Sequence, residues 1–425
     1  MYPNPQDVIP LPAKPNLQQY KKQAKDLVKA CKSGEPAAVR SWAAEWLAKL
    51  TRLQQPSVEP APEWLQGPAD QVAEFARTSL TKSECALADA QFVIARAHGF
   101  KSWPTFARHI EALTLAGSPV SKFETAADAI IAGDLAQLQS LLREDPELIR
   151  SRSTREHGAT LLHYVSANGV ENFRQKTPTN AVEVTEILLR AGAEVDAAAD
   201  LYGGGSTTLG LVATSIHPWL AGVQNAMLEV LLDHGAAIDG LPAGWNPLVA
   251  ALHNDRPEAA AFLAARGASL DLEGAAGVGR LDVVKSFVSD DSVSASDSDR
   301  LAQLQSGFIW ACEYGHAQVV EYLLDKGVDL RAGENTGQTA LHLAAHRGQL
   351  EIIKLLLDRG APLEAKNVYG GTVLGQATWS VVHGQRTIDF VPVIEMLLAA
   401  GAKIEEADYP TGNPRVDELL RRHGK

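Results

Sequence analysis

One stretch decides the fold: ENTGQTALHLAAHRGQLEIIKLLLDRGAPLEAKN, from Glu334 to Asn367. It opens with a polar turn and continues with a short apolar segment from Thr339. It then breaks at Gly348 and runs through a leucine-rich segment that stops at Gly360. A threonine at a helix start can accept hydrogen bonds from free backbone amides, and a glycine after the last turn favours a left-handed stop. The stretch therefore predicts a short helix, a glycine turn and a longer helix.

The same pattern recurs along most of the chain. Thirty-three residues before Gly348 and Gly360 lie Gly315 and Gly327, and a further copy ends at Gly267. The pattern predicts eight copies from residue 124 onward and a C-terminal half copy, RVDELLRRHG. Because no single unit can bury its apolar face alone, we expect the units to stack into a solenoid.

The tetrapeptide Thr339-Ala340-Leu341-His342, with its mid-repeat glycine and terminal Gly-Ala, resembles the Thr-Pro-Leu-His signature of the ankyrin repeat. The resemblance covers about 300 residues, roughly 70% of the chain. It implies an all-α solenoid of helix-turn-helix repeats with short hairpin turns, preceded by a small helical domain. The expected domains are a helical module (1–118), the array (119–407) and a capping half-repeat (408–425). A helical leader before such copies resembles bacterial ankyrin-repeat proteins, and this resemblance implies no activity.

Charge is distributed unevenly along the 425 residues, whose formal net charge is −12. Residues 1–120 carry 14 Lys and Arg against 11 Asp and Glu, and the rest carries 25 against 40. An acidic body repels phosphate backbones, so general contact of the array with nucleic acid is disfavoured. No apolar segment is long enough to span a bilayer, and the start of the sequence does not have the pattern of a signal peptide.

The three cysteines, Cys31, Cys85 and Cys312, are far apart in sequence. They show no paired spacing, which favours a reducing cytoplasm and argues against a disulfide frame or a cysteine-rich zinc site.

Residues 1–118 are expected to form a separate helical module. A helix capped by Asn16 runs to about Cys31, and a second helix carries Trp42 and Trp46, which we interpret as core residues. A third helix is predicted from Ala69 to about Thr78, after a proline-rich break. The first helix presents a basic stripe of Lys21, Lys25, Lys29 and Lys32.

Residues 88–113 have the pattern of a helix-turn-helix with a turn at Gly99. On one interpretation the segment binds DNA: Arg96, Lys101 and Arg108 contact phosphates, and His109 meets a base edge. On the other it is an ordinary hairpin that packs on the first repeat, which Phe100 and Trp103 favour. The first interpretation makes the protein a nucleic-acid-associated regulator.

No enzyme signature can be placed in the sequence. His342 and His346 have the i, i+4 spacing of zinc ligands, but no third ligand is evident, and we expect the tetrapeptide histidines His163 and His342 to bond backbone between repeats. The glycines of Tyr369–Thr372 align with the turn before a first helix rather than with a phosphate cradle. The sequence predicts no catalytic, cofactor-binding or metal-ligating residue.

The ankyrin resemblance implies a concave binding face made of hairpin tips and first helices. The pairs before the mid-repeat glycine position are His253-Asn254, Glu313-Tyr314, His346-Arg347 and Trp379-Ser380. The turns contribute Trp245, Gln305, Gln338 and Tyr369. Such aromatic and charged residue types dominate interaction hot spots, so the sequence favours a cytoplasmic scaffold that binds another protein. Alternatively, Trp245 and Trp379 fold back onto their own loops.

Three copies carry extra residues between their helices, near 170–180, 215–224 and 379–391. From the sequence, these insertions are equally compatible with a specific contact surface and with tolerated loops.

Overall fold

The computed structural model describes residues 7–12, 14–35, 37–54, 62–80, 85–242, 244–288, 298–384 and 388–424. The chain divides into two units, Met1–Ala250 and Ala251–Lys425, and the boundary lies inside helix α12. The described residues contain helices and isolated β-bridges but no strand, which confirms the all-α expectation.

The first five helices form the N-terminal module: α1 (Leu17–Lys32), α2 (Ala38–Gln54), α3 (Pro62–Leu80), α4 (Leu87–Ala97) and α5 (Trp103–Leu113). Among the described residues, eight helix pairs follow. The pairs are α6 (Pro119–Ala132) with α7 (Leu135–Glu144), η4 (Leu161–Ser166) with α8 (Ala181–Arg190), α9 (Thr208–Thr214) with α11 (Gln224–Asp233), α12 (Pro247–His253) with α13 (Pro257–Ala265), α14 (Leu272–Gly277) with α15 (Leu281–Phe287), α16 (Ser298–Tyr314) with α17 (Ala317–Asp325), α18 (Ala340–His346) with α19 (Leu350–Asp358), and α20 (Val373–His383) with α21 (Val391–Ala399).

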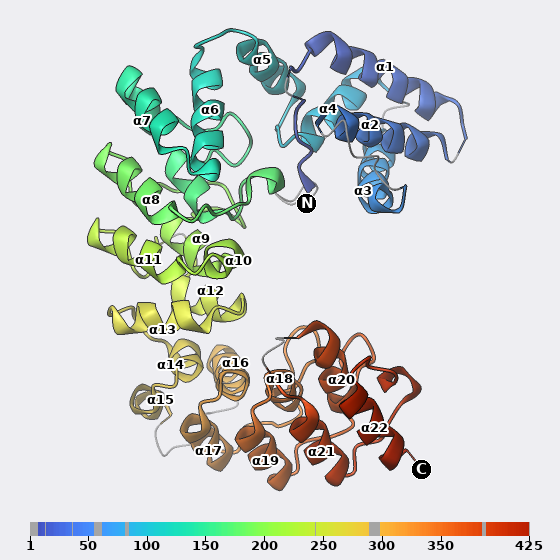
Figure 1. The fold of residues 1–425 in the computed structure, drawn as a ribbon, viewed down its shortest axis with the longest axis vertical. Helices are drawn as coiled ribbons and strands as arrows, with labels where there is room; N and C mark the ends of the chain where they lie inside the picture. The colour runs from blue at the N-terminus through green and yellow to red at the C-terminus, as the bar shows by residue number, and fades with distance from the viewer. Residues whose placement is uncertain are drawn as a thin grey trace. The chain divides into compact units, whose positions relative to one another are not determined.

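Shorter elements lie between and after these pairs: η3 (Pro146–Arg150), η5 (Asn172–Arg174), α10 (Ile216–Leu220), η6 (Glu406–Asp408) and α22 (Pro414–His423), the half copy. Within each unit, successive pairs lie side by side in sequence order (Figure 1).

The tetrapeptide histidine connects neighbouring repeats, as expected. The Thr339 amide donates to Nδ1 of His342 at 3.2 Å, and Nε2 of His342 donates to the Gly371 carbonyl of the next repeat at 3.3 Å. His163 makes the equivalent bond to the Ser206 carbonyl at 3.2 Å. Burial lowers the pKa of His163 to about 4, so this imidazole is neutral at pH 7.

Small residues allow the first helices of the second unit to approach closely. The motif GAAGVG lies in and just after helix α14, which explains it as part of a repeat. A Cβ at Gly277 would stand 2.5 Å from Leu252 Cδ1, so a side chain there would separate α14 from α12. Ala344 and Ala345 are fully buried in α18 for the same reason.

The insertion in the second repeat builds a buried charge cluster. We call Glu124, Arg155, Glu171 and Arg174 the Glu124 cluster. Arg155 donates to Glu124 at 2.6 Å and lies 2.8 Å from Glu171, and Arg174 donates to Glu124 at 2.7 Å. Burial opposes ionisation of Glu124, but the two guanidinium groups outweigh it and lower the pKa to about 2. Insertion residues Glu171 and Arg174 are therefore structural partners of the first repeat.

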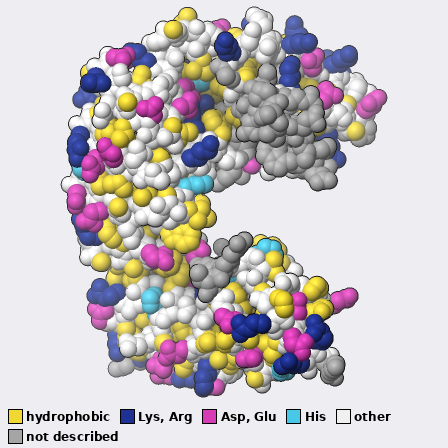
Figure 2. Space-filling view, viewed as in Figure 1, with side chains coloured by type: hydrophobic (Ala, Val, Ile, Leu, Met, Phe, Trp, Pro, Cys, Tyr) yellow, Lys and Arg dark blue, Asp and Glu magenta, His cyan; other side chains and the backbone are white. Residues whose placement is uncertain are grey.

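The N-terminal module folds largely as predicted. Asn16 caps α1 by accepting from the Gln18 amide at 2.8 Å, and Trp42 and Trp46 are buried. Lys and Arg side chains gather over α1 (Figure 2), where Lys22, Lys25, Lys29 and Lys32 are exposed and Lys21 is half-buried.

The predicted start of the third helix is wrong. Helix α3 begins at Pro62, seven residues before Ala69, and it contains Pro68. After Pro68 the helix is anchored by Val72, Ala76 and Leu80, which are buried in the core of the module, and the helix tolerates the local cost of the internal proline.

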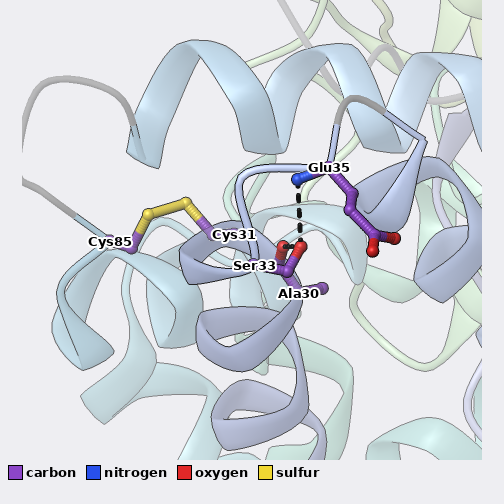
Figure 3. The surroundings of a disulfide bond; sticks show 5 residues. All are labelled: Ala30, Cys31, Ser33, Glu35 and Cys85. Carbon is purple, nitrogen blue, oxygen red and sulfur yellow. Dashed lines mark hydrogen bonds between the residues drawn. A yellow bond between two sulfur atoms is a disulfide. The ribbon is translucent and has the colours of Figure 1, made fainter.

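The expectation of unpaired cysteines is also wrong for two of the three. A disulfide joins Cys31, near the end of α1, to Cys85, just before α4, with a Cα–Cα distance of 6.0 Å (Figure 3). The α1 end is further ordered where Ser33 donates to the Ala30 carbonyl at 2.8 Å and accepts from the Glu35 amide at 3.2 Å. The bond encloses α2 and α3, and a loop of this length corresponds to roughly 4 kcal/mol of lost unfolded-state entropy. Cys312 is a buried free thiol.

Candidate partner-binding cleft

First helices and turns of successive repeats in the second unit line a cleft of about 900 Å³. Its walls come from the ends of α12 and α16, from α18 and α20, from the turn before α20, and from the segment after the last repeat. We call this the Trp379 cleft. All of its lining residues belong to the second unit.

A shared guanidinium organises one end of the cleft. Arg347 donates to Oε1 of Glu313 at 3.0 Å, forms an ion pair with Asp255, and lies over the Tyr314 ring at 5.7 Å. The Tyr314 hydroxyl donates to the Leu252 carbonyl at 2.7 Å. Burial raises the pKa of Glu313 to about 8, and Glu334 acts in the same direction. Since Glu313 shares its cation with Asp255, Arg347 compensates the burial of either carboxylate only in part.

Neutral polar side chains form the middle of the cleft. Gln338 donates to Gln376 at 2.7 Å, and Nδ1 of His346 lies 2.7 Å from the Ser380 hydroxyl. Burial lowers the pKa of His346, which keeps its imidazole uncharged at pH 7. These contacts join α18 and the turn before it to α20.

Exposed aromatic side chains form the other end. Trp379 is 51% exposed and stacks on His383 at 4.6 Å, and Val382 beside it is 56% exposed. Trp379 and Val382 lie on the second half of α20, which is 11 residues long, whereas α18 of the preceding repeat is 7 residues long. Tyr369 is 83% exposed at the hairpin tip, whose backbone is held because Asn367 accepts from the amides of Tyr369 and Gly371 at 3.0 and 2.9 Å.

The structure brings together eight of the twelve residues that the sequence nominated for the groove. Lining the Trp379 cleft are His253, Glu313, Tyr314, Gln338, His346, Arg347, Tyr369 and Trp379. His253 is held at 2.7 Å from Glu273, and this hydrogen bond raises the pKa of His253.

Four nominated residues do not line the cleft, and one of them, Ser380, is buried in α20. Trp245 packs against α9: a Cβ at Gly210, which lies in that helix, would stand 2.8 Å from the Trp245 ring. Gln305 donates to the Asp329 carbonyl at 3.1 Å, and Asn254 is exposed at the end of α12.

Several lining residues were not nominated from the sequence. Trp310 is buried and donates from its indole nitrogen to Glu273 at 2.8 Å. Glu334, Glu405 and Asp408 come from a hairpin and from the segment after the last repeat. The repeat register carries no signal for the last two, since they follow the final second helix.

The N-terminal hairpin packs on the first repeat and does not expose all of the side chains that were predicted to contact DNA. Arg96 is buried and forms an ion pair with Glu156, whose amide donates to the Gly99 carbonyl at 3.0 Å. His109 is buried with Nδ1 2.7 Å from the Thr154 hydroxyl. Two of the four proposed DNA contacts are therefore enclosed in protein, and only Lys101 and Arg108 are exposed.

Within the described ranges, no group of histidine, cysteine and carboxylate side chains could hold a metal ion. Nor is any described helix long and apolar enough to cross a membrane.

Comparison with known proteins agrees with this architecture. A family model described as ankyrin repeats (3 copies) matches residues 272–367 and 308–408. No curated protein matches the chain. Among solved structures, the human ASB11 ankyrin repeat domain is similar at 20% identity and a TM-score of 0.34, over 66% of this chain and 99% of that one. Ankyrin repeats are in general protein–protein interaction modules. The family model therefore identifies ankyrin repeats in residues 272–408 of this chain.

Proposed function

We propose that the protein is a non-enzymatic scaffold that binds another protein in the Trp379 cleft. The observation that carries this proposal is that Trp379, Val382 and Tyr369 expose large apolar surfaces at one end of the cleft. Hydrogen bonds and ion pairs hold the side chains at its other end. Exposed aromatic residues on an ordered frame are the usual energetic centres of protein interfaces, because they bury much area while losing little conformational entropy.

The test is affinity capture from a lysate of the source cells with the whole chain and a Trp379→Ala/Tyr369→Ala double variant. Both side chains are at least half exposed, so the variant should keep its fold while losing the partner. A Trp219→Ala chain is the matched control, because Trp219 is an exposed tryptophan on α10 in the first unit. Capture that survives the double variant would place the interface elsewhere.

The nucleic-acid alternative now depends on the exposed lysines of α1 and on Lys101 and Arg108. Binding of the full chain to duplex DNA in low salt, lost on replacing Lys25 and Lys29 with glutamine, would support it.

For location, the Cys31–Cys85 bond opposes the sequence-based expectation of the cytoplasm, because disulfides persist mainly in oxidising compartments. Alkylation of thiols in intact cells before lysis decides between the two. Modification of Cys31 and Cys85 supports the cytoplasm, and their protection supports an oxidising compartment.

A further inference from the structure

We propose that the occupant of the Trp379 cleft is a basic peptide segment, with one lysine or arginine against the Trp379 ring and another near Glu334. This inference rests on the proposed function, because it names the chemistry of the partner for the same cleft. It is carried by an excess of acidic side chains over cationic ones, combined with an exposed aromatic face.

The charges of the cleft are not balanced from within. Five acidic residues line it against one arginine: Asp255, Glu313, Glu334, Glu405 and Asp408 against Arg347. Arg347 is already shared between Asp255 and Glu313, and Glu405 pairs with Lys366 at 2.7 Å. Even with Glu313 protonated, carboxylates outnumber the single guanidinium. A cationic ligand would relieve the mutual repulsion of these groups, and an anionic one would increase it.

Glu334 is the carboxylate best placed to meet such a ligand. In the part of the chain that the structure describes, it makes no ion pair, and it accepts only a neutral hydroxyl, that of Thr336, at 2.6 Å. Its field reaches other lining groups, since it helps to raise the pKa values of Glu313 and His253. Asp408, in contrast, is buried and accepts from the Glu405 amide at 2.7 Å, which assigns it to the structure of the C-terminal segment.

The aromatic end supplies the second half of the site. A cation over an indole face is attracted by the ring quadrupole, and tryptophan is the strongest of the aromatic residues in this respect. Trp379 and Tyr369 leave ring surface open to solvent, and the neighbouring His346 adds no opposing charge because burial lowers its pKa. A cleft of about 900 Å³ has room for several residues of an extended segment.

The experiment is selection of a randomised twelve-residue phage-displayed peptide library on the full-length chain. Recovered peptides are then bound to wild type, Trp379→Ala and Glu334→Gln at low and moderate salt. We expect enrichment of lysine and arginine, a roughly 3- to 30-fold loss of affinity for Trp379→Ala, and a several-fold loss for Glu334→Gln that shrinks as salt rises. Glu351→Gln is the matched control, because it removes an exposed carboxylate on α19 outside the cleft and should leave affinity unchanged.

The outcomes separate this inference from the proposed function. Neutral or acidic peptides that wild type binds and Trp379→Ala loses would overturn the basic occupant while leaving the interaction cleft in place. Basic peptides that bind wild type and both cleft variants equally would show attraction elsewhere on the acidic array and would overturn the inference. Recovery of no peptide would overturn it as well, and the lysate capture would then test the cleft separately.

Discussion

The second and eighth repeats both carry extra residues between their two helices, and these insertions produce opposite surfaces. In the second repeat the extra residues carry Glu171 and Arg174 inward, where they complete the Glu124 cluster and leave its charges compensated. In the eighth repeat the extra length extends α20 and leaves Trp379 and Val382 exposed beside a cleft rich in carboxylates. One insertion therefore supplies buried ion pairs to its repeat, and the other leaves apolar surface exposed to solvent.

The largest expected effect is the loss of unfolding free energy when the Glu124 cluster is disrupted. Glu171→Gln leaves the guanidinium groups of Arg155 and Arg174 with one carboxylate fewer in a fully buried site. Breaking a buried ion pair costs roughly 3–5 kcal/mol of unfolding free energy, to be measured by urea unfolding followed by circular dichroism. Glu186→Gln, which breaks the exposed i, i+4 pair with Arg190, should cost less than about 1 kcal/mol. Equal effects of the two variants would contradict a structural role for the insertion.

Acidification should weaken the same cluster. The pKa of Glu124 is about 2 in the folded chain and near 4.5 when unfolded, so the unfolded state binds more protons between these values. The stabilisation is complete above about pH 5 and is lost as pH falls towards 2, by roughly 3 kcal/mol. Unfolding free energy measured at several pH values from 7 down to 3 should show this decline, and Glu124→Gln should flatten it. An unchanged slope in the variant would assign the acid sensitivity to other groups.

The buried histidines should add a second, separate decline. Burial lowers the pKa of His98, and that of His109, to about 4, while the unfolded side chains titrate near 6.5. Their contribution is therefore present above about pH 6.5 and is lost as pH falls towards 4. The loss of stability due to Glu124 occurs at lower pH than the loss due to His98 and His109, which distinguishes the two.

A smaller effect tests whether the contact between Gly348 and Ile388 holds the insertion of the eighth repeat in place. Gly348 has a φ of 69°, and a Cβ there would stand 2.8 Å from Cγ2 of Ile388, at the end of that insertion. Gly360→Ala is the matched control, because its φ is 77° but its Cβ would meet nothing within 4 Å. We expect Gly360→Ala to cost about 1–2 kcal/mol from backbone strain alone, and Gly348→Ala to cost roughly 1 kcal/mol more. Equal midpoints in thermal unfolding would mean that Ile388 does not anchor the insertion on Gly348.

The smallest expected effect on stability belongs to the exposed tryptophan. Trp379→Ala should cost less than about 1 kcal/mol, because half of the side chain is already in contact with water. Trp310→Ala, in the same cleft, should cost roughly 3–5 kcal/mol because Trp310 is buried and its indole donates to Glu273. Similar losses in urea unfolding would mean that Trp379 supports the fold rather than a partner.

Much of the array could be predicted from its sequence. The spacing of Gly315, Gly327, Gly348 and Gly360 gives the repeat period, and the tetrapeptide beginning at Thr339 marks a helix start that the structure confirms. The candidate groove followed from the same register, which is why eight nominated residues share one cleft. Contacts between distant segments could not be read in this way, because nothing local in the sequence encodes them.

Cys31 and Cys85 show where local reasoning stops. Their separation of 54 residues has no recognisable spacing, and they meet only because α1 packs against α4. Arg96 and His109 likewise have the residue types of DNA contacts, yet packing of the hairpin on the first repeat encloses both. Glu405 and Asp408 join the cleft because the chain after the last repeat folds back against α20.

By itself, the sequence determined that this protein is a stack of helix pairs, because glycine stops, threonine caps and apolar spacing act over a few residues. Tertiary structure alone decided which charged and aromatic side chains are paired and buried inside the protein and which stay exposed. The physical reason is that burial and ion pairing depend on which neighbours the fold supplies: Glu171 is buried beside two arginines, whereas Trp379 has two histidine rings beside it and stays half exposed.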